Sequence, residues 1–156
     1  MKKHAICNEL FGEISFAQSC FLLQKHGYGG MEIAPFTLSD DPRELASSRV
    51  GETRLMLEDH GLEFAGLHWL FVKPEGLHIT TPDEKTRRRS WDHLKRLVDL
   101  AGRLGGGSLV LGSPKQRNRL GIPREQAVGY LEEGLRSLAD FTACRNSACA
   151  LMSSGL

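Results

Sequence analysis

Short apolar runs and longer amphipathic stretches alternate along this chain. The apolar runs at residues 5–11, 31–35, 63–71 and 108–112 have the length and composition of buried β-strands. Each run is followed by a segment in which apolar residues recur at helical spacing, as on the buried side of an amphipathic helix. The pattern therefore predicts a strand followed by a helix, four times over.

The predicted helices begin at capping signals and end at glycines. Ser15 with Gln18 three residues later has the form of a capping box. The segments Asp41-Pro42-Arg43-Glu44 and Thr81-Pro82-Asp83-Glu84 each combine a cap, a proline for the first turn and an acidic residue, and Pro123 opens the last helix. The first three helices are predicted to end at Gly27, Gly61 and the glycines at 105–107.

Short strands that alternate with capped helices predict an α/β fold with right-handed βαβ units and a parallel sheet. Two architectures remain open at this point: an open doubly wound sheet and a closed barrel. A dinucleotide-binding fingerprint would favour the open sheet, but no G-x-G-x-x-G follows any predicted strand. The glycines at 105–107 precede a strand, so we interpret them as a helix stop.

Composition narrows the classes of protein. The formal net charge is +1, which argues against a nucleic-acid partner, and no apolar stretch has the length of a membrane span. The chain shows no signal peptide. Its four cysteines form no C-x-x-C pair and have no histidine at zinc-ligand spacing, as is typical of reduced thiols (Cys7, Cys20, Cys144 and Cys149). We therefore expect a soluble cytoplasmic protein.

Polar residues gather toward the carboxyl ends of the predicted strands, where a barrel places its active site. Strict alternation places Ile6 with Asn8, Phe64 with His68, and Leu109 and Leu111 with Ser113, on one inward face. Glu32 would share that face, near the start of its short strand.

Each candidate also has a structural interpretation. Asn8 would cap the following loop, Glu32 would pair with a basic side chain, and His68 would be a core histidine. Ser113, which precedes a proline, would organise a turn. We expect the neighbouring Trp69 to pack beneath the third helix.

Four segments resemble one protein family. Residues 5–11, 27–36, 66–70 and 111–117 read Ala-Ile-Cys-Asn-Glu-Leu-Phe, Gly-Tyr-Gly-Gly-Met-Glu-Ile-Ala-Pro-Phe, Gly-Leu-His-Trp-Leu and Leu-Gly-Ser-Pro-Lys-Gln-Arg. Together they resemble the sugar phosphate isomerase/epimerase family, whose members have a xylose isomerase-like TIM barrel. The resemblance runs from about residue 3 to about residue 141 and implies the closed barrel.

The resemblance implies an enzyme that moves a proton next to a sugar carbonyl, with a small sugar or sugar phosphate as substrate. In such relatives two carboxylates hold a divalent metal that polarises the carbonyl. Glu32 and His68 match positions that form the sugar pocket. The expected substrate-binding set, with no catalytic residue assigned, is Asn8, Glu32, His68, Ser113 and Gln116.

The chain departs from the family in length. The family's metal ligands come from strands five to eight, and a whole barrel has about 250 residues, so roughly 100 are missing. Residues 1–141 are predicted to form the first four βα units, a (β/α)₄ half-barrel with outer helices, without metal ligands. The tail, 142–156, has no acidic and one basic residue, which we interpret as a frameshift or premature stop, or else as a natural alanine-rich helix extension.

Two other functions remain open from the sequence. One is a catalytically inactive half-barrel, either a remnant or a subunit that needs a partner. The other is a metal-dependent endonuclease on a related barrel, which the near-neutral charge disfavours. In each case, the unpaired edges of the first and fourth strands predict a homo-oligomer or an aggregate.

Overall fold

The structure is a computed structural model that describes residues 4–42, 44–143 and 149–153. Its strands are β1 (Ala5–Cys7), β2 (Gly30–Ile33), β3 (Glu63–Leu67), β4 (Gly107–Leu111) and β5 (Cys149–Ser153). Its α-helices are α1 (Phe16–Lys25), α2 (Ser47–Asp59), α3 (Glu84–Leu104) and α4 (Arg124–Ala143). Short 3₁₀ turns follow three strands: η1 (Asn8–Phe11), η2 (Pro35–Thr37) and η3 (Pro114–Gln116).

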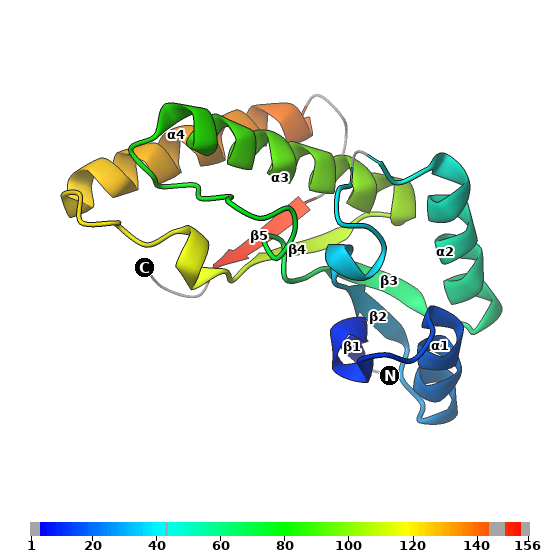
Figure 1. Cartoon of the computed structure of the whole chain (residues 1–156). Helices are drawn as coiled ribbons and strands as arrows, with labels where there is room; N and C mark the ends of the chain where they lie inside the picture. Colours follow the sequence, from blue (N-terminus) through cyan, green and yellow to red (C-terminus); the bar gives the residue numbers. More distant parts are fainter. Residues whose placement is uncertain (1–3, 43, 144–148, 154–156) are drawn as a thin grey trace.

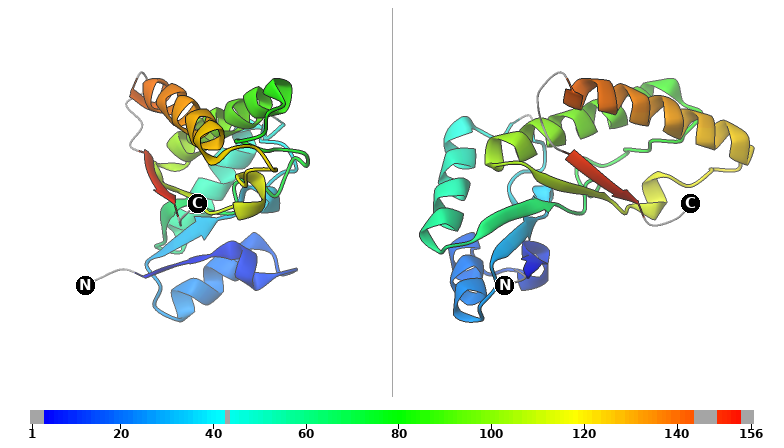
Figure 2. Two further views of the ribbon diagram at one scale, coloured as in Figure 1. Left: turned by 90° about the vertical axis from the view of Figure 1, so that its left-hand side faces the viewer. Right: turned by 180° about the vertical axis from the view of Figure 1, so that it is seen from behind.

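The strands form one parallel sheet in the order of the chain, β1-β2-β3-β4-β5. The helices lie along one face of this curved sheet, and in the described part of the chain the opposite face carries no helix (Figures 1 and 2). A doubly wound sheet reverses its strand order at a switch point, whereas a barrel adds each strand beside the last. The predicted half of a TIM barrel, with four βα units, is confirmed.

The fifth strand was not predicted. Residues 149–153 come from the tail and pair with the whole of β4, from Gly107 opposite Cys149 to Leu111 opposite Ser153. The expectation that the fourth strand lies at an open edge of the sheet is therefore wrong, because β5 pairs with that edge. The run Cys-Ala-Leu-Met-Ser lacks β-branched and aromatic residues, so propensity gave no signal, and the paired backbone of β4 supplies the stabilisation instead.

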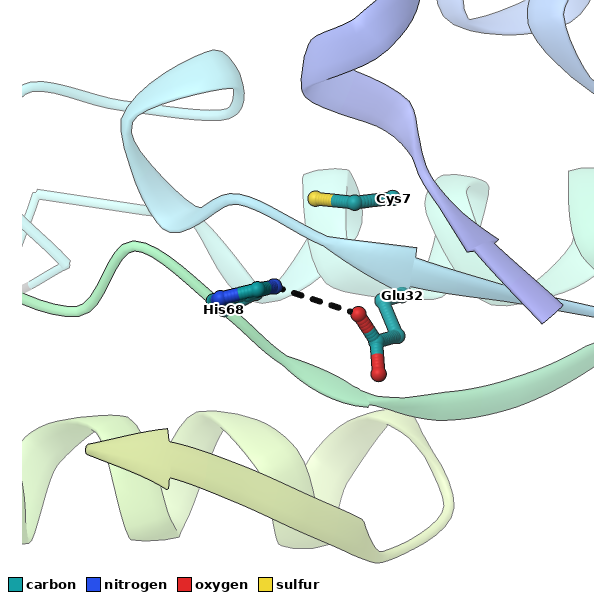
Figure 3. A group of neighbouring side chains, drawn as sticks. All are labelled: Cys7, Glu32 and His68. Atoms are coloured by element: carbon teal, nitrogen blue, oxygen red, sulfur yellow. Dashed lines mark hydrogen bonds and ion pairs between the residues drawn. The ribbon is translucent and has the colours of Figure 1, made fainter. Parts of the chain in front are cut away.

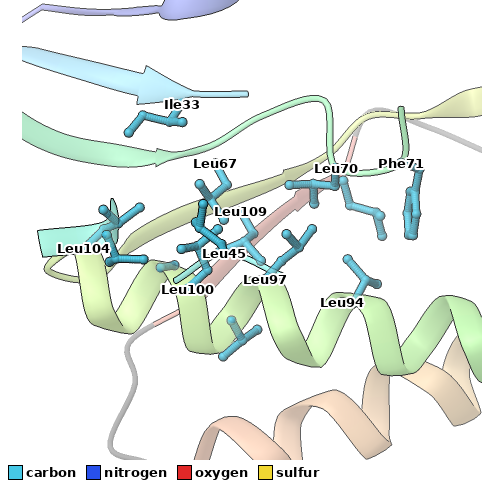
Figure 4. Close-up of a cluster of buried hydrophobic side chains, with 14 of the residues drawn as sticks. Ile33, Leu45, Leu67, Leu70, Phe71, Leu94, Leu97, Leu100, Leu104 and Leu109 are labelled. Atoms are coloured by element: carbon cyan, nitrogen blue, oxygen red, sulfur yellow. The ribbon is translucent and has the colours of Figure 1, made fainter. Parts of the chain in front are cut away.

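The hydrophobic core lies between the sheet and the helices (Figure 4). The stripe predicted for the third helix is confirmed, since all six of its members are buried: Trp91, Leu94, Leu97, Val98, Ala101 and Leu104. Burial of each such leucine stabilises the fold by about 1.5–3 kcal/mol. None of the helices in the described part of the chain combines the length and hydropathy that spanning a bilayer requires.

One predicted helix start is confirmed, at α1. The other two are wrong, and α3 begins at Glu84, after the Thr81-Pro82 pair that was predicted to open it. Ser15 and Gln18 form the predicted capping box at the start of α1, and Asp83 caps α3 by accepting a hydrogen bond from the backbone N–H of Thr86. The second helix does not start at Asp41, because α2 begins only at Ser47. Asp41 forms a separate turn, in which its carbonyl accepts a hydrogen bond from the backbone N–H of Glu44.

Candidate functional site

The two faces of the sheet differ in character. Met31 and Ile33 on β2 are fully buried in the core against the helices. Because side chains alternate along a strand, Glu32 between them lies on the helix-free face. The described part of the chain thus has a sheet face that carries a carboxylate and no helix over it.

A bulge in β3 decides which of its side chains share the face of Glu32. The single step from Met31 to Glu32 corresponds to two steps on β3, from Phe64 to Gly66. Phe64 packs against the core, and so does Leu67 three positions later, which regular alternation would forbid. The expectation that Phe64 shares a face with the histidine after β3 is therefore wrong, because the bulge reverses the alternation between them.

His68 follows β3 directly and meets Glu32 (Figure 3). Its Nδ1 lies 3.3 Å from Oε2 of Glu32, and the two side chains are 35% and 31% exposed. The pair sits at the carboxyl ends of β2 and β3, the edge where barrels bind their substrates. The structure thus brings together the two residues that the sequence matched to a sugar pocket, while their role in binding stays a prediction.

Cys7 is a third member of this group that sequence reasoning missed. Ile6, which was expected to face inward, packs against the core and pairs with Met31, so the following Cys7 lies opposite Glu32 on the helix-free face. The error has a simple cause. The first strand ends at Cys7, and the residues after it form a 3₁₀ turn, so alternation could not be counted back from Asn8.

The thiol of Cys7 is buried beside acidic side chains. Desolvation raises its pKa, the carboxylates of Glu32 and Glu9 raise it further, and a hydrogen bond with the backbone of Glu9 opposes them. One donor atom each of Cys7, Glu32 and His68 lie within 4.8 Å of one another. Figure 3 shows the three side chains converging from three segments of the chain.

Trp69 stands beside this group and is 45% exposed, so the expectation that it packs beneath the third helix is wrong. Its backbone φ is 57°, a left-handed conformation that costs a large side chain free energy. The indole stacks on the ring of His68 at 5.7 Å between centroids and donates its Nε1–H to Oε2 of Glu9 at 3.2 Å. An exposed aromatic ring held in a strained conformation indicates a functional constraint.

Asn8 follows Cys7 directly, but its side chain already hydrogen-bonds to Ala34 and Thr37. Its Oδ1 accepts a hydrogen bond from the N–H of Ala34 at 2.8 Å, and its Nδ2 donates to Oγ1 of Thr37 at 2.8 Å. Asn8 therefore ties the turn after β1 to the turn after β2. Its predicted role in substrate binding is not tested by these contacts.

Ser113 and Gln116 lie in the loop after β4. The carbonyl of Ser113 accepts a hydrogen bond from the N–H of Gln116, and the carbonyl of Gln116 accepts one from Ile79, which ties two βα loops together. The inward placement of Leu109 and Leu111 is wrong, since both are buried in the core and Leu109 points toward α3 (Figure 4). Substrate binding by Ser113 and Gln116 stays a prediction.

The described residues do not fit the metal that the family resemblance implies. Hard divalent ions such as Mg²⁺ take oxygen ligands, and the resemblance implies two carboxylates. Within residues 4–42, 44–143 and 149–153, the group of possible ligands is one thiol, one carboxylate and one imidazole: Cys7, Glu32 and His68. This set of donor atoms therefore does not suit a hard divalent ion.

Comparison with known proteins decides the family. A family model described as the xylose isomerase-like TIM barrel matches residues 21–149. The chain belongs to this family. No curated protein sequence matches the chain.

Solved structures of sugar epimerases align with nearly all of this chain. A 3-keto-D-glucoside 4-epimerase from E. coli matches with a TM-score of 0.71 at 15% identity, covering 96% of this chain and 56% of the other. A D-psicose 3-epimerase from Clostridium cellulolyticum H10, solved with D-tagatose, matches with a TM-score of 0.75 at 15% identity, covering 96% and 52%. A D-allulose 3-epimerase from Methylomonas sp., in complex with D-allulose, matches with a TM-score of 0.70 at 19% identity, covering 96% and 51%.

At these identities the similarity establishes the fold alone. The chain spans about half the length of these epimerases. It therefore corresponds to half of a xylose isomerase-like barrel, in agreement with its run of sequential parallel strands.

Proposed function

We propose that this chain provides a sugar-binding half-barrel of an isomerase or epimerase, which moves a proton next to the carbonyl of a small ketose or sugar phosphate. The observation that carries the proposal is the Glu32–His68 pair at the carboxyl ends of β2 and β3. Both side chains keep about a third of their surface exposed on the helix-free face. A pair that served only to hold the fold together would gain little from an exposed position.

The chemistry of the pair suits a polyhydroxylated ligand. The carboxylate of Glu32 accepts hydrogen bonds from sugar hydroxyls. With Nδ1–H of His68 donating to Glu32, the other ring nitrogen, Nε2, accepts a further hydroxyl proton. Two adjacent acceptors of this kind recognise neighbouring hydroxyl groups on one sugar.

Trp69 supplies the apolar side of the proposed pocket. Its ring stacks beside His68 and is fixed at the other end by Glu9. One face of a sugar presents C–H groups, which pack favourably on an aromatic ring while the hydroxyls reach polar partners. We propose that the ligand lies against Trp69 with its hydroxyls directed to Glu32 and His68.

Calorimetric titration of the purified chain with a panel of ketoses and ketose phosphates tests the binding step. We expect Glu32→Gln, His68→Gln and Trp69→Ala each to weaken binding, because each removes one contact of the proposed pocket. The matched controls are Glu13→Gln and His26→Gln, which change exposed residues of the same types outside the proposed pocket. Binding that Glu32→Gln leaves unchanged, or no binding by the parent chain, would contradict the proposal.

We propose further that this chain alone binds sugar without turning it over. The candidate site has one carboxylate, whereas proton exchange in the related epimerases is expected to use two. An assay with the ketose panel and Mn²⁺, Co²⁺ or Mg²⁺ tests this expectation. Turnover above a matched blank that a chelator abolishes would show that the chain is competent by itself.

Two further proposals concern the association of the chain with a partner and its location in the cell. The outer edge of β1 and the helix-free face favour association of the chain with a second copy or with a partner half. Light scattering after size exclusion decides this, and a folded monomer at micromolar concentration would contradict it.

The unpaired thiols of Cys7 and Cys20 support residence in the reducing cytoplasm.

A further inference from the structure

The group of Cys7, Glu32 and His68 has the dimensions of a tetrahedral metal site. Zinc bonds to nitrogen and oxygen of about 2.0–2.2 Å place two such ligands about 3.3–3.5 Å apart in a tetrahedron. Nδ1 of His68 and Oε2 of Glu32 are 3.3 Å apart. The Sγ of Cys7 lies within 4.8 Å of one ring nitrogen of His68 and of one carboxylate oxygen of Glu32, so a movement of about 1 Å brings it to the distance that a Zn–S bond near 2.3 Å requires.

The donor types select the class of ion. A thiolate with an imidazole suits a borderline-soft ion such as Zn²⁺ and suits Mg²⁺ or Ca²⁺ poorly. Three protein ligands with an open fourth position are the arrangement of catalytic zinc sites, whereas structural sites are closed by four. Here the partly exposed sides of Glu32 and His68 leave a path for an ion and for a fourth ligand.

The charged groups around Cys7 favour the binding of a cation at this group. Glu9 lies close enough to Cys7 to act on it electrostatically, and so does Glu32. The nearby indole of Trp69 carries no charge, and its N–H is already given to Glu9. A divalent cation among these groups would offset the two carboxylates and the thiolate together.

We infer that Cys7, Glu32 and His68 together bind one thiophilic divalent ion of the Zn²⁺ class. On binding, the thiol of Cys7 releases its proton to solvent, and the neutral imidazole carries its proton on Nε2, so that Nδ1 is free to bind the ion. The ion then replaces the contact between Nδ1 and Glu32. This site differs from the two-carboxylate site implied by the family resemblance, and it does not depend on the proposed binding of sugar.

Titration with Co²⁺, which replaces zinc and is visible in absorption spectra, tests the site. The chain used carries Cys20→Ser, Cys144→Ser and Cys149→Ser, so that Cys7 is its only thiol. We expect one Co²⁺ per chain, with a thiolate-to-cobalt charge-transfer band that added Zn²⁺ removes. Cys7→Ser in the same background should abolish the band while circular dichroism shows the same helical content.

Ligand and control variants complete the test. Glu32→Gln and His68→Gln should each lower Co²⁺ affinity by about 100-fold or more, since even outer-shell partners are worth about 10–100-fold. Glu13→Gln and His26→Gln should leave it unchanged. A parent chain that shows no charge-transfer band, or a band that survives Cys7→Ser, overturns the inference. If the triple background does not fold, the comparison of Cys7→Ser with Cys20→Ser in the wild-type chain gives the same decision. Sugar titrations without metal are read separately, so failure of one proposal is distinguishable from failure of the other.

Discussion

The imidazole of His68 lies 3.3 Å from the carboxylate of Glu32, although 36 positions separate the two residues in the chain. Two neighbouring parallel strands bring them together at their carboxyl ends, on the face that the helices leave open. The contact is polar, about one-third exposed and next to a tryptophan with a left-handed backbone. These properties separate it from the ion pairs on the helix surfaces, which join residues three or four positions apart.

Glu32→Gln should separate stability from binding. A partly exposed ion pair contributes about 0.2–1 kcal/mol, so the free energy of unfolding should change by less than about 1 kcal/mol. Ketose affinity should fall by about tenfold or more, since a hydrogen bond to a charged group is worth about 1.5–3 kcal/mol. Urea unfolding and calorimetry measure the two quantities. A large loss of stability with unchanged affinity would make the pair a structural one.

Gly66→Ala should disrupt the bulge in β3. A Cβ at this position, where φ is 151°, would overlap the backbone of Ser108 on β4. We expect a loss of about 2–4 kcal/mol in the free energy of unfolding, from overpacking together with backbone strain. Gly51→Ala in α2 is the matched control, because a Cβ there meets nothing within 4 Å. It should stabilise the chain by about 0.5–1 kcal/mol. Equal effects of the two substitutions in denaturant unfolding would contradict the role of the bulge.

Asn8→Ala should destabilise the fold through one buried backbone group. The N–H of Ala34 would lose its hydrogen-bond acceptor and Thr37 would lose a donor. Leaving a buried N–H without a partner costs about 1–3 kcal/mol. Asn118→Ala removes an exposed asparagine that bonds to the backbone of its own loop and to His78, and it should cost less because the bonds within its loop are more exposed. Thermal unfolding of the two variants compares them directly, and a smaller loss at Asn8 would contradict the assignment.

Asp83 should make the stability of α3 depend on pH in acid. Its side chain and backbone hydrogen bonds with Thr86 lower its pKa below the ordinary 3.8. A carboxyl group with a lowered pKa in the folded state contributes stability above its unfolded pKa, and this contribution is lost as the pH falls through the folded pKa. Asp83→Asn should therefore be less stable than the parent at neutral pH, with the difference shrinking below pH 3.8. A difference that stays constant from neutral pH to pH 2 in unfolding experiments would contradict this.

Much of the fold could be predicted from the sequence because the patterns that specify its helices and strands are local. The buried stripe of α3 repeats at helical spacing over the whole helix, and the capping box of Ser15 lies within one turn. The start of α2 could not be predicted from a local pattern. Asp41 and Glu44 meet the same local requirements in a turn as at a helix start, and only packing distinguishes the two.

Only part of the candidate site could be predicted from the sequence. Glu32 stands out as an acidic residue in an apolar strand, and its identification needed no pairing partner. Cys7 and Trp69 gave no comparable signal, since a cysteine and a tryptophan beside an apolar run are commonly core residues. Their placement depends on where β1 ends and on the left-handed backbone at Trp69, and neither follows from alternation.

The bulge in β3 makes the pairing of that strand with β2 a part of the site. If Ala65 were deleted from a related chain, the bulge would disappear, yet regular alternation would still direct Phe64 and Leu67 toward the helices and the imidazole of His68 toward Glu32. If Ala65 were retained and the strand paired without a bulge, the same imidazole would turn toward the helices. When homologous chains are compared, a one-residue gap at Ala65 is therefore compatible with the same site.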